Sequence, residues 1–379
     1  MAMVAGEASG DLLASLLLKP LGQQVSGLDA YGIGGPRMIA EGFRADWPID
    51  KLAVRGYIEV LRHYSEIAGI RRQLRRDLLK HPPSVFVGID APDFNLDLEV
   101  QLREAWRGQK RPVVHFIGPS IWAWRGKRIE KIARAVDHIL VVFPFEEEIY
   151  RKAGIAATYV GHPLADVIPM KPDRAAARRT LGLPDHARVV ALMPGSRLSE
   201  IGYMAESFID AAALLHRRDP HIRFVVPMSS APARAAFEAI RSSRQTELPL
   251  QIVDGQSHAV LAAADAVLVA SGTATLETAL FKRPMVIAYQ VNALTAVLMR
   301  RMGYIPWVGL PNILAREFVV PEFLQEAATP QALADAITFQ LDDEPNRRRL
   351  EDRFGAMHET LRRNTGERAA TVIAGLLDA

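Results

Sequence analysis

Cysteine is absent from this sequence of 379 residues, which excludes a disulfide framework and a zinc site built from thiolates. The absence also fits a cytosolic location. No uninterrupted apolar run reaches about 18 residues, so we expect no membrane-spanning helix. The first residues lack the basic start and the apolar core of an export signal, and we expect none in this sequence.

An excess of one charge is also missing, because 46 basic residues stand against 43 acidic ones and the net charge is +3. This balance does not indicate a nucleic-acid partner. The histidines do not cluster at the spacing of metal ligands, and Asp90 and Asp93 are spaced too loosely to argue for a divalent ion. We therefore expect no nucleic-acid partner, no metal and no other cofactor.

The sequence does contain two series of short apolar runs that alternate with helical patterns. The runs of the first series are residues 3–6, 30–35, 84–90, 113–117, 137–143 and 157–160, and those of the second are 189–193, 223–226, 250–253, 266–270 and 285–288. A segment with several prolines, 161–172, separates the two series. The alternation predicts an α/β fold with two doubly wound parallel sheets that face each other across a cleft. Ligands of such sheets bind beyond the carboxyl ends of the strands.

One such strand end carries the turn Ser271, Gly272 and Thr273, which follows the apolar run 267–269 and opens a helix. The free N–H groups at a helix start favour an anion such as phosphate. Glu277 lies in the first turns of this helix, where a carboxylate can accept two hydrogen bonds from a ribose. An ordinary strand–helix turn, with Glu277 favouring the helix start, explains the same pattern.

A second strand end carries Gly195, Ser196 and Arg197. Glycine permits a close approach of the backbone, and arginine can bind a diphosphate through its fork of donors. The alternative is a surface arginine in a turn. Asn312 follows Pro311 and is either a ligand in a further loop or a turn residue.

In the first half of the chain, Asp90 ends an apolar strand. A carboxylate at such an edge, near apolar walls, can have a raised pKa and act as a general base. An aspartate of the turn before proline is the other interpretation, and Asp93 is a second candidate. Glu7, Ser9 and Asp11 follow the first strand and could bind a hydroxyl or a phosphate, although Ser9 and Asp11 could instead cap the first helix.

Between residues 60 and 80, apolar side chains recur at helical spacing and basic side chains are interleaved. The basic residues include Arg71, Arg72, Arg75 and Arg76. The pattern is that of a basic amphipathic helix on anionic lipid. It is more commonly that of a helix whose apolar face packs on the sheet.

Six segments together resemble one enzyme family. They are residues 4–11 (VAGEASGD), 88–95 (GIDAPDFN), 119–124 (PSIWAW), 160–164 (VGHPL), 194–197 (PGSR) and 271–277 (SGTATLE). One segment alone would be weakly specific. The ordered set runs through most of the chain and is similar to the lipid-A-disaccharide synthases, and the match departs mainly at the short N-terminus.

The resemblance implies a GT-B glycosyltransferase of family 19 with two Rossmann-like domains and no required metal. It implies an acceptor-side domain over residues 1–164, a UDP-sugar-binding domain over 165–345, and C-terminal helices over 346–379 that pack back on the first domain. The implied reaction joins UDP-2,3-diacylglucosamine to 2,3-diacylglucosamine 1-phosphate, with inversion at the anomeric carbon. The products are the β-1,6-linked lipid A disaccharide 1-phosphate and UDP, in lipopolysaccharide biosynthesis.

The same resemblance assigns roles on the donor side. Arg197, in the loop with Gly195 and Ser196, and the turn 271–273 would hold the diphosphate and stabilise the departing UDP. Glu277 would bind the ribose hydroxyls, and Asn312 would help to hold the nucleotide.

On the acceptor side, the resemblance makes Asp90 the base that takes the proton of the acceptor 6-hydroxyl. Glu7, Ser9, Asp11 and the nearby Asp93 would line the acceptor site.

Both implied substrates carry acyl chains, so the helix over 60–80 becomes a docking patch for an anionic membrane surface. Its docking residues would be Arg71, Arg72, Arg75 and Arg76. The implied location is cytoplasmic, peripheral on the inner face of the inner membrane. The sequence does not distinguish a monomer from a homodimer in which the helical tail exchanges between subunits.

Other function classes stay open at this point. A UDP-N-acetylglucosamine 2-epimerase shares the two-domain layout and needs one soluble nucleotide sugar without an acceptor. A muramyl-lipid glycosyltransferase is another GT-B enzyme. A non-catalytic sugar-nucleotide binding protein would have the UDP site and catalyse no reaction.

Overall fold

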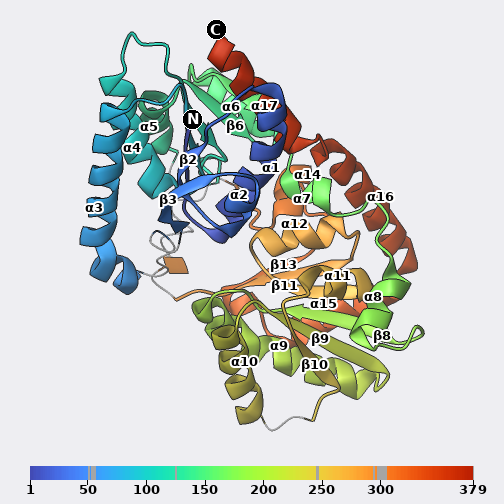
Figure 1. Ribbon diagram of the computed structural model, residues 1–379. Helices are drawn as coiled ribbons and strands as arrows, with labels where there is room; N and C mark the ends of the chain where they lie inside the picture. Colours follow the sequence, from blue (N-terminus) through green and yellow to red (C-terminus); the bar gives the residue numbers. More distant parts are fainter. Residues whose placement is uncertain are drawn as a thin grey trace. The chain divides into compact units, whose positions relative to one another are not determined.

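The computed structural model describes residues 1–49, 52, 57–123, 126–244, 247–292, 295–296 and 305–378, except for the side chains at 8 and 57–64. The chain divides into two compact units (Figure 1). The first unit is Met1–Asp166 with Leu361–Ala379, and the second is Val167–Thr360. The sequence predicted domain boundaries after residues 164 and 345.

Within the described residues, the first unit contains a seven-stranded sheet in the order β3-β2-β1-β4-β5-β6-β7, and all of its strand pairs are parallel. The strands are β1 (Ala2–Ala5), β2 (Tyr31–Gly34), β3 (Arg44–Pro48), β4 (Phe86–Ile89), β5 (Val113–Phe116), β6 (His138–Val141) and β7 (Ala157–Tyr159). The helices are α1 (Ala8–Gln24), α2 (Pro36–Ala40), α3 (Tyr57–Lys80), α4 (Pro92–Ala105), α5 (Arg128–Ala135), α6 (Pro144–Lys152) and α17 (Thr365–Asp378), and α7 (Pro163–Val167) leads into the second unit. The predicted doubly wound sheet is confirmed.

The second unit has a six-stranded parallel sheet among the residues that the structure describes, in the order β10-β9-β8-β11-β12-β13. Its strands are β8 (Arg188–Met193), β9 (Ile222–Met228), β10 (Leu250–Asp254), β11 (Ala266–Ala270), β12 (Met285–Tyr289) and β13 (Glu322–Leu324). Its helices are α8 (Arg174–Leu181), α9 (Leu198–Arg218), α10 (Ala231–Ser243), α11 (Ser257–Ala263), α12 (Thr273–Leu280), α14 (Leu310–Ala315), α15 (Pro330–Asp342) and α16 (Glu344–Leu361), with the 3₁₀ helix η2 (Gln325–Ala327).

Two edge strands, β3 and β13, were not predicted. The residues of β3 alternate between exposed and half-buried, and β13 has only three residues, of which none is buried. The central strands β1, β4 and β11 are buried along their whole length, because helices cover both faces of a parallel sheet. Apolar runs therefore reveal central strands and leave short polar edge strands without a signal.

The C-terminal helices do not all belong to one unit, as the expected segment 346–379 would require. Helix α16 packs in the second unit, where Arg349 donates to the Val319 carbonyl at 3.3 Å and Arg353 pairs with Glu317. Helix α17 belongs to the first unit and packs along α1.

The start of α17 is capped by Asp166. Its carboxylate accepts hydrogen bonds from the backbone N–H groups of Arg363, Asn364 and Thr365 at 3.1, 3.0 and 2.7 Å. Thr365 is the first residue of α17 and the other two residues directly precede it, so the aspartate binds the backbone donors at the helix start. The cap anchors the end of the chain in the first unit.

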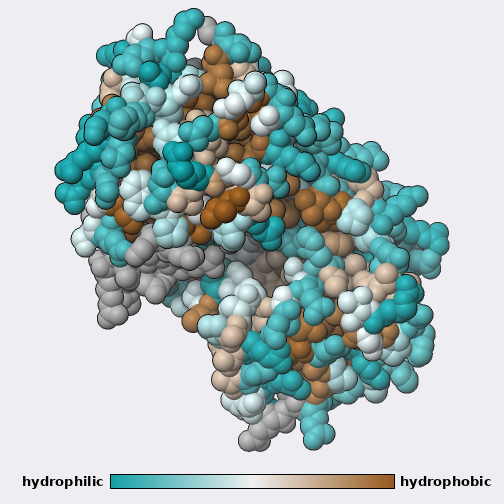
Figure 2. Space-filling view, in the orientation of Figure 1, coloured by the Kyte–Doolittle hydropathy of each residue, from teal (hydrophilic) through white to brown (hydrophobic). Residues whose placement is uncertain are grey.

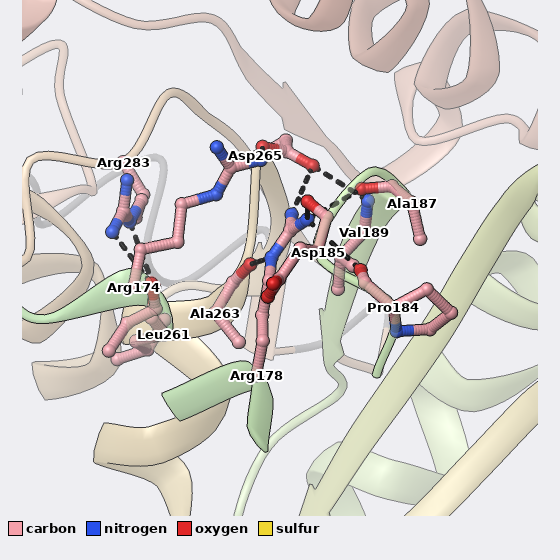
Figure 3. A network of polar contacts seen from close by, with 11 residues as sticks. Arg174, Arg178, Pro184, Asp185, Ala187, Val189, Leu261, Ala263, Asp265 and Arg283 are labelled. Carbon is pink, nitrogen blue, oxygen red and sulfur yellow. Dashed lines mark hydrogen bonds and ion pairs between the residues drawn. The ribbon is translucent and has the colours of Figure 1, made fainter. Parts of the chain in front are cut away.

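An arginine network lies at the amino ends of β8 and β11 (Figure 3). Arg178 is 1% exposed, pairs with Asp265 at 2.8 Å and donates to the carbonyls of Ala263 and Ala187 at 3.1 and 2.9 Å. Asp265 also accepts from the backbone N–H of Val189 at 2.8 Å. The network joins α8 to two central strands at the edge of the sheet opposite to the carboxyl ends.

Candidate active site

The first candidate site lies at the carboxyl ends of β1 and β4, where the strand order of the first sheet reverses. Asp90 directly follows β4, and Asp90 and Ala91 have left-handed backbone conformations with φ of 51° and 43°. Ile117, directly after β5, has φ of 68°. A positive φ is uncommon outside glycine and is an outlier for a β-branched residue. Strained positions of this kind cluster at functional sites.

Two residues, Asn95 and Gly6, make the strained turn possible. Asn95 is fully buried, and its amide donates to the carbonyls of Asp90 at 2.8 Å and Ile89 at 3.4 Å. A Cβ at Gly6 would lie 2.4 Å from the Cβ of Ala91, so only glycine lets the loop after β1 approach this turn. The segments 4–11 and 88–95 therefore meet at one place, as two strand ends of one sheet predict.

The pKa of the Asp90 carboxyl is raised above its usual value. Burial is the main cause, and the negative charge of Glu7 adds to it, whereas His115 and the backbone N–H of Ala91 lower the pKa. A half-buried carboxylate with a raised pKa, at a ligand-binding edge of the sheet, can accept a proton from a hydroxyl near neutral pH. The position fits the predicted general base.

Sequence reasoning missed a buried histidine–glutamate pair near Asp90. His115 on β5 and Glu99 on α4 are both completely buried, with 2.7 Å between Nδ1 and Oε1. A Cβ at Gly88 would lie 2.0 Å from Oε1 of Glu99. The glycine inside the apolar strand 84–90 was the available signal, because a glycine in a strand often marks a close approach of another group.

Asp11 differs from the prediction that it lines the acceptor site. Its side chain is buried and accepts from the backbone N–H groups of Gly35, Arg37 and Met38 at 3.1, 3.1 and 3.0 Å. These donors belong to the start of α2, so the carboxylate caps that helix. Asp11 is therefore a structural residue that holds the loop after β2.

The other three acceptor-side candidates have separate surroundings. Glu7 is at the N-cap position of α1, makes no capping bond, and interacts electrostatically with Asp90. Ser9 is exposed in the first turn of α1. Asp93 is exposed in the first turn of α4 and pairs with Arg128. Only Glu7 is thus tied to Asp90 by an interaction that the structure identifies.

The second candidate site lies at the carboxyl end of β11. Gly272 has φ of 152° and ψ of −164°, a conformation that is essentially restricted to glycine. Ser271 Oγ donates to the Val308 carbonyl at 2.9 Å, and Thr275 Oγ1 accepts from the Leu310 N–H at 3.2 Å. Gly272 and Thr273 are exposed, so the start of α12 is open to solvent, as a phosphate site requires.

Glu277 lies one turn into α12 with a side chain that is 19% exposed. Burial raises its pKa to about 7. His258, which the sequence analysis missed, lies with Nε2 3.8 Å from Oε2 of Glu277. The carboxylate remains accessible and can accept hydrogen bonds, in agreement with a ribose-binding position.

The turn after β8 differs from the predicted anion-binding backbone. The carboxylate of Glu200 accepts from the N–H groups of Ser196 at 2.9 Å and Arg197 at 3.2 Å. A Cβ at Gly195 would lie 2.5 Å from the Cβ of Glu200, so the glycine makes room for this capping residue. The backbone donors are satisfied inside the protein, whereas the side chain of Arg197 is 68% exposed with a 3.5 Å contact to Glu200. An anion would be bound by the guanidinium.

Asn312 is also committed to the protein. Its amide nitrogen donates to the Val320 carbonyl at 2.9 Å and to Glu322 at 2.8 Å, and its oxygen accepts from the N–H groups of Val319 and Val320 at 2.8 and 3.0 Å. The side chain is fully buried and all of its hydrogen-bonding capacity is used. Asn312 therefore positions the segment between α14 and β13, and a direct contact to nucleotide would require these bonds to break.

The predicted docking helix is α3, and its described part does not offer an apolar face. Ile67, Ile70, Leu74 and Leu78 pack into the core of the first unit. The expectation of an apolar docking face on the helix over 60–80 is therefore wrong for these residues, because their side chains pack on the sheet. The side chains at 60–64 lie outside the described residues. The outer surface over α3, at the left of the view, is mostly hydrophilic (Figure 2).

The four arginines of α3 are not equivalent. Arg71 pairs with Asp97 at 2.8 Å, and the Nε of the half-buried Arg75 has no hydrogen-bond partner. Arg72 and Arg76 are exposed, and Arg72 donates to the Ala68 carbonyl of its own helix at 3.2 Å. Two of the four predicted positions are thus fully available to an anionic surface.

Among the described residues, no three acidic or histidine side chains are grouped as metal ligands would be. In the same residues, no helix has the length and apolar character needed to cross a bilayer.

Comparison with known proteins points to one family. Over residues 1–373 the chain matches the family described as lipid-A-disaccharide synthetase. A lipid-A-disaccharide synthase of Cupriavidus pinatubonensis is 58% identical over 377 residues, which cover 99% of this chain and 92% of that protein. One of Paraburkholderia xenovorans is 56% identical over 378 residues, which cover 100% of this chain and 96% of that protein. The solved glycotransferase of kitacinnamycin has the same fold, with a TM-score of 0.64, 17% identity, and coverage of 99% of this chain and 98% of that one.

Proposed function

The chain belongs to the lipid-A-disaccharide synthase family, and from this premise we propose how its residues carry out the reaction. It is a glycosyltransferase of the GT-B fold that acts in lipid A disaccharide synthesis. The donor is UDP-2,3-diacylglucosamine and the acceptor is 2,3-diacylglucosamine 1-phosphate. The observation that carries the mechanism is the half-buried Asp90 carboxyl in a strained turn at the reversal point of the first sheet.

Asp90 is the general base of this proposal. It takes the proton of the acceptor 6-hydroxyl as the oxygen attacks the anomeric carbon of the donor, and the bond between that carbon and the UDP oxygen breaks. A single displacement inverts the anomeric centre. Negative charge develops on the diphosphate of the departing UDP, and the exposed start of α12 and the guanidinium of Arg197 stabilise it.

The direct test is turnover in the presence of EDTA. Purified protein is incubated with UDP-2,3-diacylglucosamine and 2,3-diacylglucosamine 1-phosphate, and the disaccharide 1-phosphate is sought by mass spectrometry. We expect the same rate with and without EDTA, because a guanidinium and a helix start supply the positive charge that a metal would supply. A rate that falls with EDTA and recovers with a divalent ion would contradict the metal-free mechanism. Absence of product would contradict the transfer itself.

The affinity for UDP should depend on pH through Glu277. Burial places the pKa of this carboxyl at about 7, so the carboxylate that accepts two ribose hydrogen bonds is present above that pH and is lost below it. We expect UDP to bind roughly tenfold more weakly at about pH 6 than at about pH 8, because hydrogen bonds to charged groups are the stronger ones. Calorimetric titration at the two pH values measures this.

The matched variants for this prediction are Glu277→Gln and His258→Gln. The first should bind UDP weakly at both pH values, and the second should keep the pH dependence even though it removes the neighbouring titratable group. If His258→Gln abolishes the dependence and Glu277→Gln retains it, the histidine is the responsible group and the ribose assignment is wrong.

We also propose that the exposed arginines of α3 hold the protein at an anionic membrane surface, peripheral on its cytoplasmic side. Reversing the charge of Arg72 and Arg76 to glutamate should weaken binding to vesicles containing anionic lipid by at least about tenfold, since each basic residue near such a surface contributes about 1 kcal/mol. Cosedimentation with vesicles measures the change. Reversal of Arg217 and Arg348, exposed on helices of the second unit, is the control for net charge, and an equal loss there would refute a local patch.

A further inference from the structure

We propose that the buried pair of His115 and Glu99 is an imidazolium–carboxylate group that stabilises the ionised form of Asp90, with His115 as a positioning residue for the base. This inference rests on the proposed role of Asp90. It concerns two completely buried residues that act only through Asp90.

The sheet register places the pair next to Asp90. His115 on β5 is the direct neighbour of Gly88 on β4, and Asp90 follows Gly88 by two residues. Paired residues of parallel strands present their side chains to the same face. Since Gly88 has no side chain, the space beside the imidazole is filled by the Glu99 carboxylate, which would lie 2.0 Å from any Cβ at Gly88. The glycine is thus required for the pair.

The chemistry of the pair indicates a charged imidazole. Burial alone would lower the pKa of His115, but the charge and hydrogen bond of Glu99, the nearby Asp90 and the backbone of Ile117 raise it, and the net direction is upward. The surroundings of His115 therefore favour the protonated ring, as the proposal requires. Its positive charge is held in a region without water, where charges interact more strongly than in solution.

Two buried atoms of the pair have no partner of hydrogen-bond geometry, Nε2 of His115 and Oε2 of Glu99. The backbone of Ile117 lies close enough to favour the protonated ring without satisfying these atoms. A buried ion pair is weak support for stability, and an apolar replacement is often as stable. A merely structural role therefore gives a poor account of the pair, whereas a fixed positive charge beside a base accounts for it.

The groups that act on Asp90 come from three elements. His115 on β5 and the backbone N–H of Ala91 at the start of α4 favour the carboxylate, whereas Glu7 before α1 favours the protonated form. Burial has the largest effect, and it also favours the protonated form. The imidazolium is the only side-chain cation among these contributors, and it favours the ionised base by limiting the rise in the pKa of Asp90.

The first measurement uses the unaltered protein and does not depend on catalysis. In protein labelled with ¹⁵N in its histidine rings, we expect both ring nitrogens of His115 to show the shifts of imidazolium at about pH 7. In Glu99→Gln the ring should be neutral at the same pH. A neutral ring in the unaltered protein overturns the inference whatever the role of Asp90, and this result stands even if the variants do not fold.

The second measurement is the pH dependence of kcat/KM. Asp90 must be ionised to accept a proton, so the rate rises with pH through its pKa, and removal of the cation raises that pKa. We expect His115→Gln and Glu99→Gln each to move the acidic limb of the kcat/KM profile to higher pH by about one unit. At pH values below the limb kcat/KM should fall roughly tenfold, and above it kcat/KM should change little. His138→Gln on the next strand, where the ring bonds Thr158 at 2.8 Å, should leave the limb in place.

The outcomes separate the inference from the proposed function. If Asp90→Asn abolishes turnover while both variants leave the acidic limb unmoved, Asp90 is the base and the coupling is refuted. If Asp90→Asn keeps turnover, the base assignment fails. A ¹³C titration of the Asp90 carboxyl then tests the coupling alone, with an upward shift in His115→Gln expected and an unchanged titration contradicting it.

Discussion

The Asp90→Asn variant is expected to lose about 10²- to 10⁴-fold in kcat, the range that a positioned general base contributes, and to bind UDP as tightly as the unaltered protein. The amide cannot accept the proton of the acceptor hydroxyl. The proposed nucleotide-binding residues, Arg197, Glu277 and the turn after β11, belong to the second unit, so UDP binding should be unaffected. Initial rates and calorimetric titration with UDP measure the two quantities.

Asparagine is the appropriate replacement because of the backbone at this position. Asp90 has φ of 51°, a region that asparagine and aspartate tolerate far better than most residues. Loss of activity in Asp90→Asn will thus not reflect loss of the turn. The control is Asp29→Asn, before β2, where the side chain is exposed and pairs with Arg44. Full activity in Asp90→Asn, or equal losses in both variants, would argue against Asp90 as the base.

The Asp265→Ala variant is expected to destabilise the second unit by about 3–5 kcal/mol, the cost of breaking a buried ion pair from one side. The change leaves the guanidinium of Arg178, 1% exposed, without its counter-charge and removes the acceptor of the Val189 N–H. Arg174 loses the same partner. Several carbonyls still accept from Arg178 (Figure 3), but they carry no compensating charge.

Urea unfolding followed by circular dichroism measures this effect, with the transition midpoint as the readout because two units need not unfold in one step. Asp335→Ala is the control, since its pair with Arg218 is exposed and surface pairs contribute little. Its midpoint should stay unchanged. If the two variants behave alike, the Arg178 network contributes no more than a surface pair and the prediction is wrong.

The ends of the central strands could be predicted, and with them the positions of the candidate ligand-binding residues. Asp90, Glu277 and the turn at Gly272 are each found at the carboxyl end of a strand or in the helix after it. These positions follow from local patterns, because an apolar run followed by small or acidic residues defines both the strand and its end. Polar edge strands such as β3 and β13 gave no such pattern and were missed.

The sequence by itself determined the family, the two parallel α/β sheets and the strand ends that carry the candidate residues, because local periodicity and ordered motifs encode them. Only the tertiary structure decided how each polar side chain is used. Asp11 and Asn312 proved to be committed to backbone groups of other segments, and Glu200 to the donors expected to bind an anion. Burial and hydrogen-bond partners are set by the packing of distant segments, so a carboxylate or amide that caps a loop and one that binds substrate have the same local sequence signature.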